Sequence, residues 1–197
     1  MSDGFGLDAY LTRVGGTRTL APGLEGLAVL HRAHCAAIPF ENLDILLGRS
    51  IALDLLSLQA KLVRDRRGGY CFEQNTLFKA ALEALGYRVT ALAARVRVGT
   101  TEVRPRTHML LRVDLPEGTF VNHFTSTHPR SAFVLNLAAQ RSWPERRALL
   151  RNRDLVVREN GSSTPTTVRD PDHLLEILDS VFGLAFPTGT RFARPEF

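Results

Sequence analysis

The most informative segment of this chain reads Arg67-Gly68-Gly69-Tyr70-Cys71-Phe72-Glu73-Gln74-Asn75. Its two adjacent glycines permit backbone angles closed to other residues, and they let another surface approach closely. Residues 71–85 carry apolar side chains at helical spacing, and Gly86 is a natural stop. Cys71 is therefore expected at a helix N-terminus, where the N–H groups and the dipole favour a thiolate. A buried structural cysteine is the alternative, but the glycines before Cys71 and the polar residues after it favour a nucleophile.

Length and composition narrow the class of protein. The 197 residues suit one domain or two small ones, and 44% apolar residues are enough to bury a core. Two cysteines, Cys35 and Cys71, make no disulfide framework, which favours a reducing cytoplasm. The net charge of +5 comes almost wholly from arginine and could serve a phosphate-bearing cofactor. We find no nucleic-acid motif, no Cys/His spacing typical of zinc, no secretory signal and no membrane-spanning stretch.

The order of the expected elements indicates an α+β protein. Apolar spacing predicts helices over 7–14, 22–37 and 58–66, the last capped by Ser57, in addition to the helix over 71–85. Partial alternation then predicts antiparallel strands over 87–98 and 107–115. In the tail we expect a helix over 131–140, strands over 149–157 and 164–168, and a helix that begins at Pro171 and stops at Gly183.

The segment Ile38-Pro39-Phe40-Glu41-Asn42-Leu43-Asp44-Ile45 reads as a loop of mixed character, and it has two interpretations. In one, it is a packed turn in which Asn42 and Asp44 cap local N–H groups. In the other, Phe40 lies on a pocket wall and Glu41 forms an ion pair that braces a site. The segment alone does not separate the two.

A thiol nucleophile needs a base, and His108 is the best placed of six histidines because it opens the second predicted strand. An imidazole within hydrogen-bond reach can hold the thiolate as an ion pair and later return the proton. A lone histidine is more often a satisfied surface or core residue, so the assignment depends on the rest of the pattern.

Four segments in order resemble the arylamine N-acetyltransferase family. They are 38–44, 67–75, Thr107-His108-Met109-Leu110 and Phe124-Thr125-Ser126-Thr127-His128-Pro129. The resemblance covers nearly the whole chain. It implies an N-terminal helical bundle (1–86), a truncated antiparallel β-barrel that carries the histidine (87–122) and a C-terminal α/β lid (123–197), around a cysteine-protease-like (transglutaminase- or papain-like) core.

The resemblance also implies a chemistry. Acetyl-CoA would donate acetyl to Cys71, with His108 as base, and an arylamine or arylhydrazine would accept it, as in xenobiotic metabolism. Phe40 would line the acceptor pocket, and Arg13 would form with Glu41 a buried pair that braces the site. The residues expected near the CoA cleft are Phe124, Ser126 and Thr127, although the Ser and Thr could simply cap a helix. No metal, nucleic acid or membrane is expected, and a homodimer could close the shortened barrel.

The chain departs from the family after the histidine strand. The segment that normally carries the third triad residue, an Asp, is absent, because Asn122 already matches a later segment. In the serine-protease template, replacing that residue with Asn lowers turnover about 10⁴-fold. Asp114 is a poor substitute, since six residues of strand separate it from His108 by roughly 20 Å. Asn122 is a weak candidate for the third position.

These observations leave three functions open. The first is an acetyltransferase impaired by the missing segment. The second is a non-catalytic remnant that binds CoA or a partner. The third is a Cys–His hydrolase, thioesterase-like or amidase-like, in which water replaces the amine.

Overall fold

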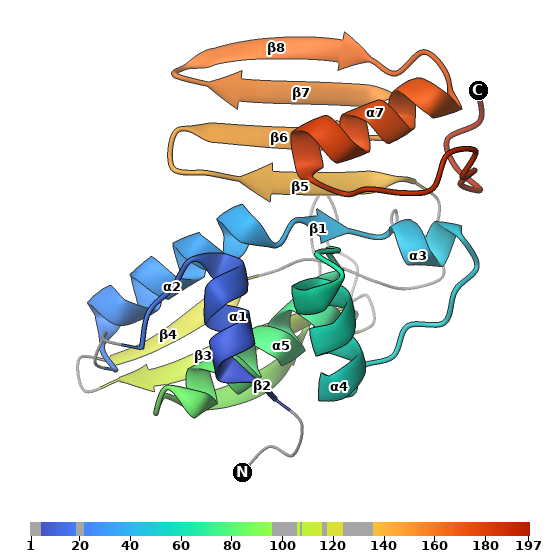
Figure 1. The fold of residues 1–197 in the computed structure, drawn as a ribbon. Coiled ribbons are helices and arrows are strands. Elements are labelled where there is room, and N and C mark those ends of the chain that lie inside the picture. The colour runs from blue at the N-terminus through green and yellow to red at the C-terminus, as the bar shows by residue number, and fades with distance from the viewer. Residues whose placement is uncertain (1–4, 19–21, 96–105, 107, 116–117, 124–135) are drawn as a thin grey trace.

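The computed structural model describes residues 5–18, 22–95, 106, 108–115, 118–123 and 136–197. Figure 1 shows two parts joined by the short strand β1. The lower part combines helices with a three-stranded sheet, and the upper part is a larger sheet with the helix α7 on one face. The chain is therefore α+β, as the sequence predicts.

The helices of the lower part follow the predicted apolar spacing closely. They are α1 (Leu7–Val14), α2 (Leu24–Ala37), α4 (Leu55–Leu58), the π-helical segment η1 (Gln59–Arg64) and α5 (Cys71–Ala84). The predicted cap at Ser57 is wrong. Asp54 caps α4 instead, because its Oδ1 accepts a hydrogen bond from the Ser57 N–H at 2.9 Å.

The predicted barrel remnant is a three-stranded antiparallel sheet of β2 (Arg88–Ala94), β3 (His108–Leu115) and β4 (Gly118–His123). These strands form no closed barrel within the described residues. Leu111 and Val113 on β3 are buried in the same core as Tyr10 of α1 and Phe78 of α5. The predicted helical unit and the histidine-bearing strands therefore share one hydrophobic core.

The upper sheet has the strand order β1-β5-β6-β7-β8. Its members are β1 (Phe40–Glu41), β5 (Ala138–Ser142), β6 (Arg146–Arg151), β7 (Asp154–Glu159) and β8 (Ser162–Thr167), with α7 (Pro171–Phe182) packed on it. Leu43 and Leu46 of the short helix α3 (Leu43–Leu46) belong to its core. The segment expected to be a loop over 38–45 is thus a strand and a helical turn that connect the two parts.

Two expectations for the tail are corrected. Residues 138–140 lie in β5 rather than in a helix, and residues 131–135 lie outside the described part of the chain. The single strand expected over 149–157 is a hairpin of β6 and β7. Asn152 turns the chain there with a φ of 53°, a conformation that asparagine tolerates better than most residues. The final helix agrees with its prediction, since Gly183 ends it with a φ of 69°.

Candidate functional site

The glycine pair before Cys71 allows other groups to come close to the backbone of the turn. A Cβ on Gly68 would lie 2.2 Å from the Pro39 carbonyl oxygen, and a Cβ on Gly69 would lie 2.8 Å from Oε2 of Glu73. Neither glycine has a positive φ; in this turn Arg66 does, at 54°. Of the two predicted reasons for the pair, the approach of another surface is therefore confirmed and unusual backbone angles are not.

The surface that approaches is the backbone of the segment around β1. The Glu41 N–H donates to the Gly69 carbonyl at 3.1 Å, and the Gly69 N–H donates to the Pro39 carbonyl at 3.3 Å. Two of the four sequence motifs, 38–44 and 67–75, are thus one hydrogen-bonded unit. The position of Cys71 depends on both.

Cys71 is the first residue of α5, and it is fully buried. The Glu73 side chain accepts a hydrogen bond from the Tyr70 N–H at 3.0 Å, which is one half of a capping box and fixes the start of the helix. The sequence prediction of a cysteine at a helix N-terminus is confirmed.

His108 is the first residue of β3 and is 1% exposed. The next residue is tied to α5, because Nδ2 of Asn75 donates to the Met109 carbonyl at 2.8 Å. Asn75 lies four residues after Cys71, so both occupy the same face of the helix. The start of the histidine strand is therefore fastened to the helix face that begins with the thiol.

A cluster of buried charges lies beneath the turn. Glu41 pairs with Arg67 at 2.8 Å, and Arg67 also reaches Asp44 at 3.1 Å. The Lys61 ammonium bridges Asp44 and Glu73, at 2.7 Å to each. Since a buried carboxylate that loses its cation is strongly destabilised, this network holds the turn, η1 and the first turn of α5 in one arrangement.

The pKa values within the cluster follow from burial and charge together. Burial raises the pKa of Glu73 above its usual range, although Lys61 and the Tyr70 N–H oppose the rise. Burial acts in the same direction on Asp44, but Lys61 and Arg67 outweigh it and lower its pKa. Burial would lower the pKa of Lys61, but the Glu41 and Glu73 carboxylates raise it overall. Neighbouring opposite charges therefore oppose the effect of burial on each of these three groups.

The expected ion pair between Arg13 and Glu41 is wrong. Nε of Arg13 donates to the Leu62 carbonyl at 3.1 Å, and its Nη2 donates to the Arg66 carbonyl at 3.4 Å. Burial lowers the pKa of Arg13 to about 10. Arg67, within the turn itself, is closer to β1 and takes the carboxylate instead.

A buried polar chain behind the turn was missed from the sequence. Nε2 of Gln74 donates to the Pro39 and Gly69 carbonyls at 2.8 and 3.2 Å, so its Oε1 must be the atom that accepts from Nε2 of His34 at 2.7 Å. The Tyr10 hydroxyl then donates to Nδ1 of His34 at 3.0 Å. In the sequence, His34 looks like any other packed residue of its helix. Only its contact with Gln74, beside the turn, shows that it supports the site.

The other predicted residues fall in several places. Phe40 is buried on β1.

The candidates for a third triad residue lie along β3 and β4. Nε of Arg112 reaches Oδ1 of Asp114 at 3.3 Å, and Asp114 pairs in register with Thr119 at the far end of β3 from His108. The register puts Asn122 opposite Leu111, three residues along β3 from His108, or roughly 10 Å. The predicted CoA residues Phe124, Ser126 and Thr127 lie outside the described residues.

No group of three or more His, Cys, Asp or Glu side chains in the described residues is placed to hold a metal ion. None of the helices in the same residues has the length and apolar character needed to cross a lipid bilayer.

The fold and the site together define an α+β protein with a buried cysteine at a helix N-terminus and a buried histidine on the adjoining strand. Residues 23–122 and 119–190 match the N-acetyltransferase family. The chain belongs to this family, the arylamine N-acetyltransferases.

Individual relatives agree with this placement. The arylamine N-acetyltransferase / N-hydroxyarylamine O-acetyltransferase of Salmonella typhimurium is 47% identical over 116 residues, which is 58% of this chain and 41% of that protein. The arylamine N-acetyltransferase of Escherichia coli is 45% identical over the same shares. The matched region thus spans less than half the length of these relatives.

Solved structures extend the likeness to most of the fold. The Salmonella typhimurium arylamine N-acetyltransferase superposes with a TM-score of 0.83 at 29% identity and covers 90% of each chain. The Mycobacterium marinum arylamine N-acetyltransferase in complex with CoA gives 0.80 at 26% identity, covering 91% of this chain and 93% of that one.

Proposed function

We propose that this chain transfers an acetyl group from acetyl-CoA to an arylamine or arylhydrazine through an acetyl-cysteine at Cys71. The observation that carries the proposal is the hydrogen bond from Asn75 to the Met109 carbonyl, which holds the strand of His108 against the helix face of Cys71. Relatives named arylamine N-acetyltransferase, and the complex of one of them with CoA, support the choice of donor and acceptor.

The first half-reaction uses the thiol and the imidazole as a pair. His108 takes the proton of Cys71, and the thiolate attacks the acetyl carbonyl carbon. The bond between that carbon and the CoA sulfur then breaks, and the departing sulfur takes the proton from His108. In the second half, the amine nitrogen attacks the acetyl-cysteine, gives its proton to His108 and leaves with the acetyl group, so the thiolate is restored.

The surrounding residues would position these groups. The cluster of Glu41, Asp44, Lys61, Arg67 and Glu73 braces the turn that delivers the thiol. Phe40, on the strand paired with that turn, would line the acceptor pocket. By the resemblance, Phe124, Ser126 and Thr127 would lie along the CoA cleft.

A second candidate function is a non-catalytic remnant that binds CoA. It is favoured by the register of β3 and β4, which places Asp114 at the far end of β3 from His108 and pairs Asn122 with Leu111. The third triad residue normally orients the imidazole and stabilises the imidazolium, so its loss would leave binding intact while slowing chemistry.

Incubation with acetyl-CoA and no amine, followed by peptide mass mapping, tests the first proposal. We expect an acetyl adduct on the Cys71 peptide that Cys71→Ala abolishes and Cys35→Ala retains. Burial raises the pKa of Cys35 to about 11, so this second thiol is a fair matched control. The absence of any Cys71 adduct would refute acetyl transfer.

The rate of iodoacetamide alkylation at Cys71 separates the two candidates. An ordinary thiol gives a rate that rises with a midpoint near about pH 8.5, and the non-catalytic candidate predicts this profile. Rapid alkylation well below that pH indicates an activated thiolate. Product analysis with and without an amine then distinguishes transfer from hydrolysis.

A further inference from the structure

Gln74 ties together the two backbone segments that set the position of Cys71. It lies near the start of α5, and its Nε2 donates to the Pro39 carbonyl at 2.8 Å and to the Gly69 carbonyl at 3.2 Å. The Ile38 carbonyl is 3.5 Å from the same nitrogen. An amide turned the other way would place its oxygen against three carbonyl oxygens, where only a donor fits. The orientation of this amide therefore decides how firmly the segment after α2 is bound to the turn before the thiol.

His34 determines the orientation of the Gln74 amide. Nε2 of His34 lies 2.7 Å from Oε1 of Gln74, although the two residues are 40 positions apart in the sequence. Since the amide oxygen can only accept, the imidazole must carry its proton on Nε2. Both side chains are buried, so a reversed amide would set one donor against another with no solvent to replace the lost bond.

Tyr10 fixes the proton of His34 on the required nitrogen. Burial lowers the pKa of His34 to about 3, so the ring is neutral at pH 7 and carries a single proton. Its Nδ1 lies 3.0 Å from the Tyr10 hydroxyl and accepts the hydroxyl proton. The Phe78 ring packs on the imidazole with 4.9 Å between ring centroids, which limits rotation of the imidazole. Each hydrogen bond of this buried chain therefore points the same way, toward the backbone of the turn.

We propose that His34 is a positioning residue for the Cys71 thiol and acts through the amide of Gln74. The Gly69 carbonyl lies two residues before the thiol, so its release would move Cys71 relative to the helix N–H groups that favour a thiolate. This inference rests on the proposed role of Cys71 as the nucleophile. Its test follows the reactivity of the thiol and needs no acetyl transfer.

The test is the rate of iodoacetamide alkylation at Cys71 as a function of pH, read by peptide mass mapping. The midpoint of this profile reports thiolate formation, whereas a general loosening of the fold changes the maximal rate. The matched variants are His34→Met and His34→Gln, because both side chains are unbranched and only glutamine can donate to Gln74. His34→Met should raise the midpoint by about half a unit or more, which lowers the rate at pH 7 at least about threefold. His34→Gln should keep the native midpoint.

A second comparison shows whether His34 acts through Gln74. Gln74→Met removes the donor to the turn directly and should raise the midpoint as His34→Met does. In the Gln74→Met background the difference between the two His34 variants should vanish, because no amide is left to orient. If His34→Met fails to fold in urea unfolding, Gln74→Met alone carries the test, and an unchanged midpoint in that variant overturns the proposal.

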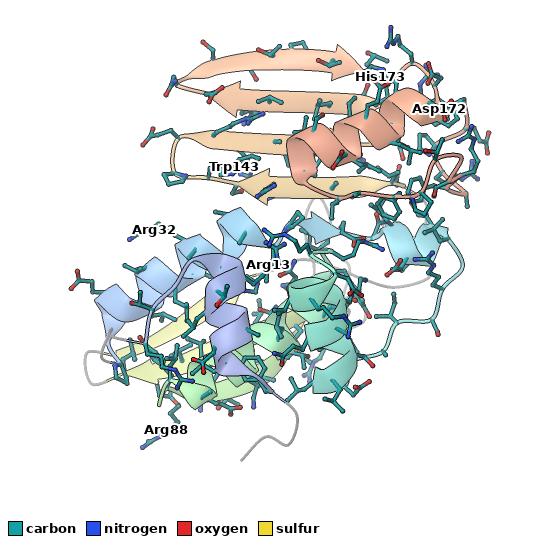
Figure 2. All side chains as sticks on the ribbon, in the orientation of Figure 1. Arg13, Arg32, Arg88, Trp143, Asp172 and His173 are labelled. Carbon is teal, nitrogen blue, oxygen red and sulfur yellow. The ribbon has the colours of Figure 1, made fainter. Side chains whose placement is uncertain are left out.

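Arg88→Gln is the remote control. Figure 2 shows Arg88 on β2 at the lower end of the molecule, and β2 follows the end of α5 that lies about 15 Å of helix beyond Gln74. Arg88 is exposed, and its substitution should leave the midpoint unchanged.

The outcomes separate this inference from the proposed function. A native midpoint near about pH 8.5 would refute an activated thiol, and the positioning role with it. A native midpoint well below that value, unchanged in His34→Met, would overturn the positioning role alone. The expected shifts in a chain that forms no acetyl adduct would refute acetyl transfer and leave the positioning role standing.

Discussion

Acidification should destabilise this protein through one buried imidazole. His34 is 3% exposed, and it sits between Tyr10 and Gln74. Burial lowers its pKa from 6.5 to about 3, even though the hydrogen bond to Gln74 opposes the shift. The test lowers the pH from 7 to 5 and compares the resulting loss of stability in the native chain with that in His34→Gln. Glutamine keeps a donor for Gln74 but cannot be protonated.

The sign and size follow from proton linkage. Between pH 6.5 and about 3 the unfolded chain binds a proton at His34 that the native chain does not, so the free energy of unfolding falls as the pH falls. A solution pH of 5 lies about 1.5 units below the pKa of the imidazole in the unfolded chain, and each unit is worth about 1.4 kcal/mol. The expected contribution is therefore about 2 kcal/mol.

Urea unfolding at pH 5 and pH 7, at one ionic strength, measures this contribution. The loss of stability on acidification should be about 2 kcal/mol larger for the native chain than for His34→Gln. Glu73, whose raised pKa gives the opposite pH dependence near its own titration, is present in both chains and cancels in the comparison.

Tyr10→Phe is the matched control, since it removes a hydrogen bond but leaves the histidine buried. It should keep the acid sensitivity of the native chain. Equal losses in the native chain and in His34→Gln would refute a neutral, desolvated His34.

Three more perturbations test the site. Gly68→Ala places a Cβ against the Pro39 carbonyl and should cost about 1–3 kcal/mol of stability in urea unfolding. An unchanged stability would show that the two backbone segments can move apart at no cost. Lys61→Met removes the cation paired with buried Glu73 and one of the cations paired with Asp44, and it should cost about 3 kcal/mol of stability. Lys61→Arg should recover part of this loss, and a neutral effect of Lys61→Met would contradict the cluster. Asn75→Ala should cost only about 1 kcal/mol of stability yet slow Cys71 acetylation about tenfold or more, because the histidine strand loses its tether; an unchanged rate would contradict positioning.

Some of the site could be predicted because its signal is local. The helix that begins at Cys71 and the final helix that ends at Gly183 follow from apolar spacing and from stops within the same stretch of chain. The family resemblance also rests on contiguous motifs. Such features need no knowledge of which distant residue comes near.

Other features of the site could not be predicted from the sequence because they depend on contacts between distant segments. Glu41 could have paired with either of two arginines, and only the fold places Arg67 within 2.8 Å. The glycine pair was expected to permit unusual angles and the close approach of another surface, but only the fold shows that the approaching group is the Pro39 carbonyl, which comes from another part of the chain. The polar chain through His34 likewise joins three helices far apart in sequence.

The sequence by itself determined the class of fold, the helix that starts at the thiol, the strand that starts at the histidine and the family to which they belong. These depend on the periodicity and order of residues along the chain. Tertiary structure decided which cations neutralise the buried carboxylates, which carbonyl the glycines make room for, and which arginines lie over the Trp143 ring. Those outcomes depend on distances between segments, which burial of two shared cores fixes and which no local pattern records.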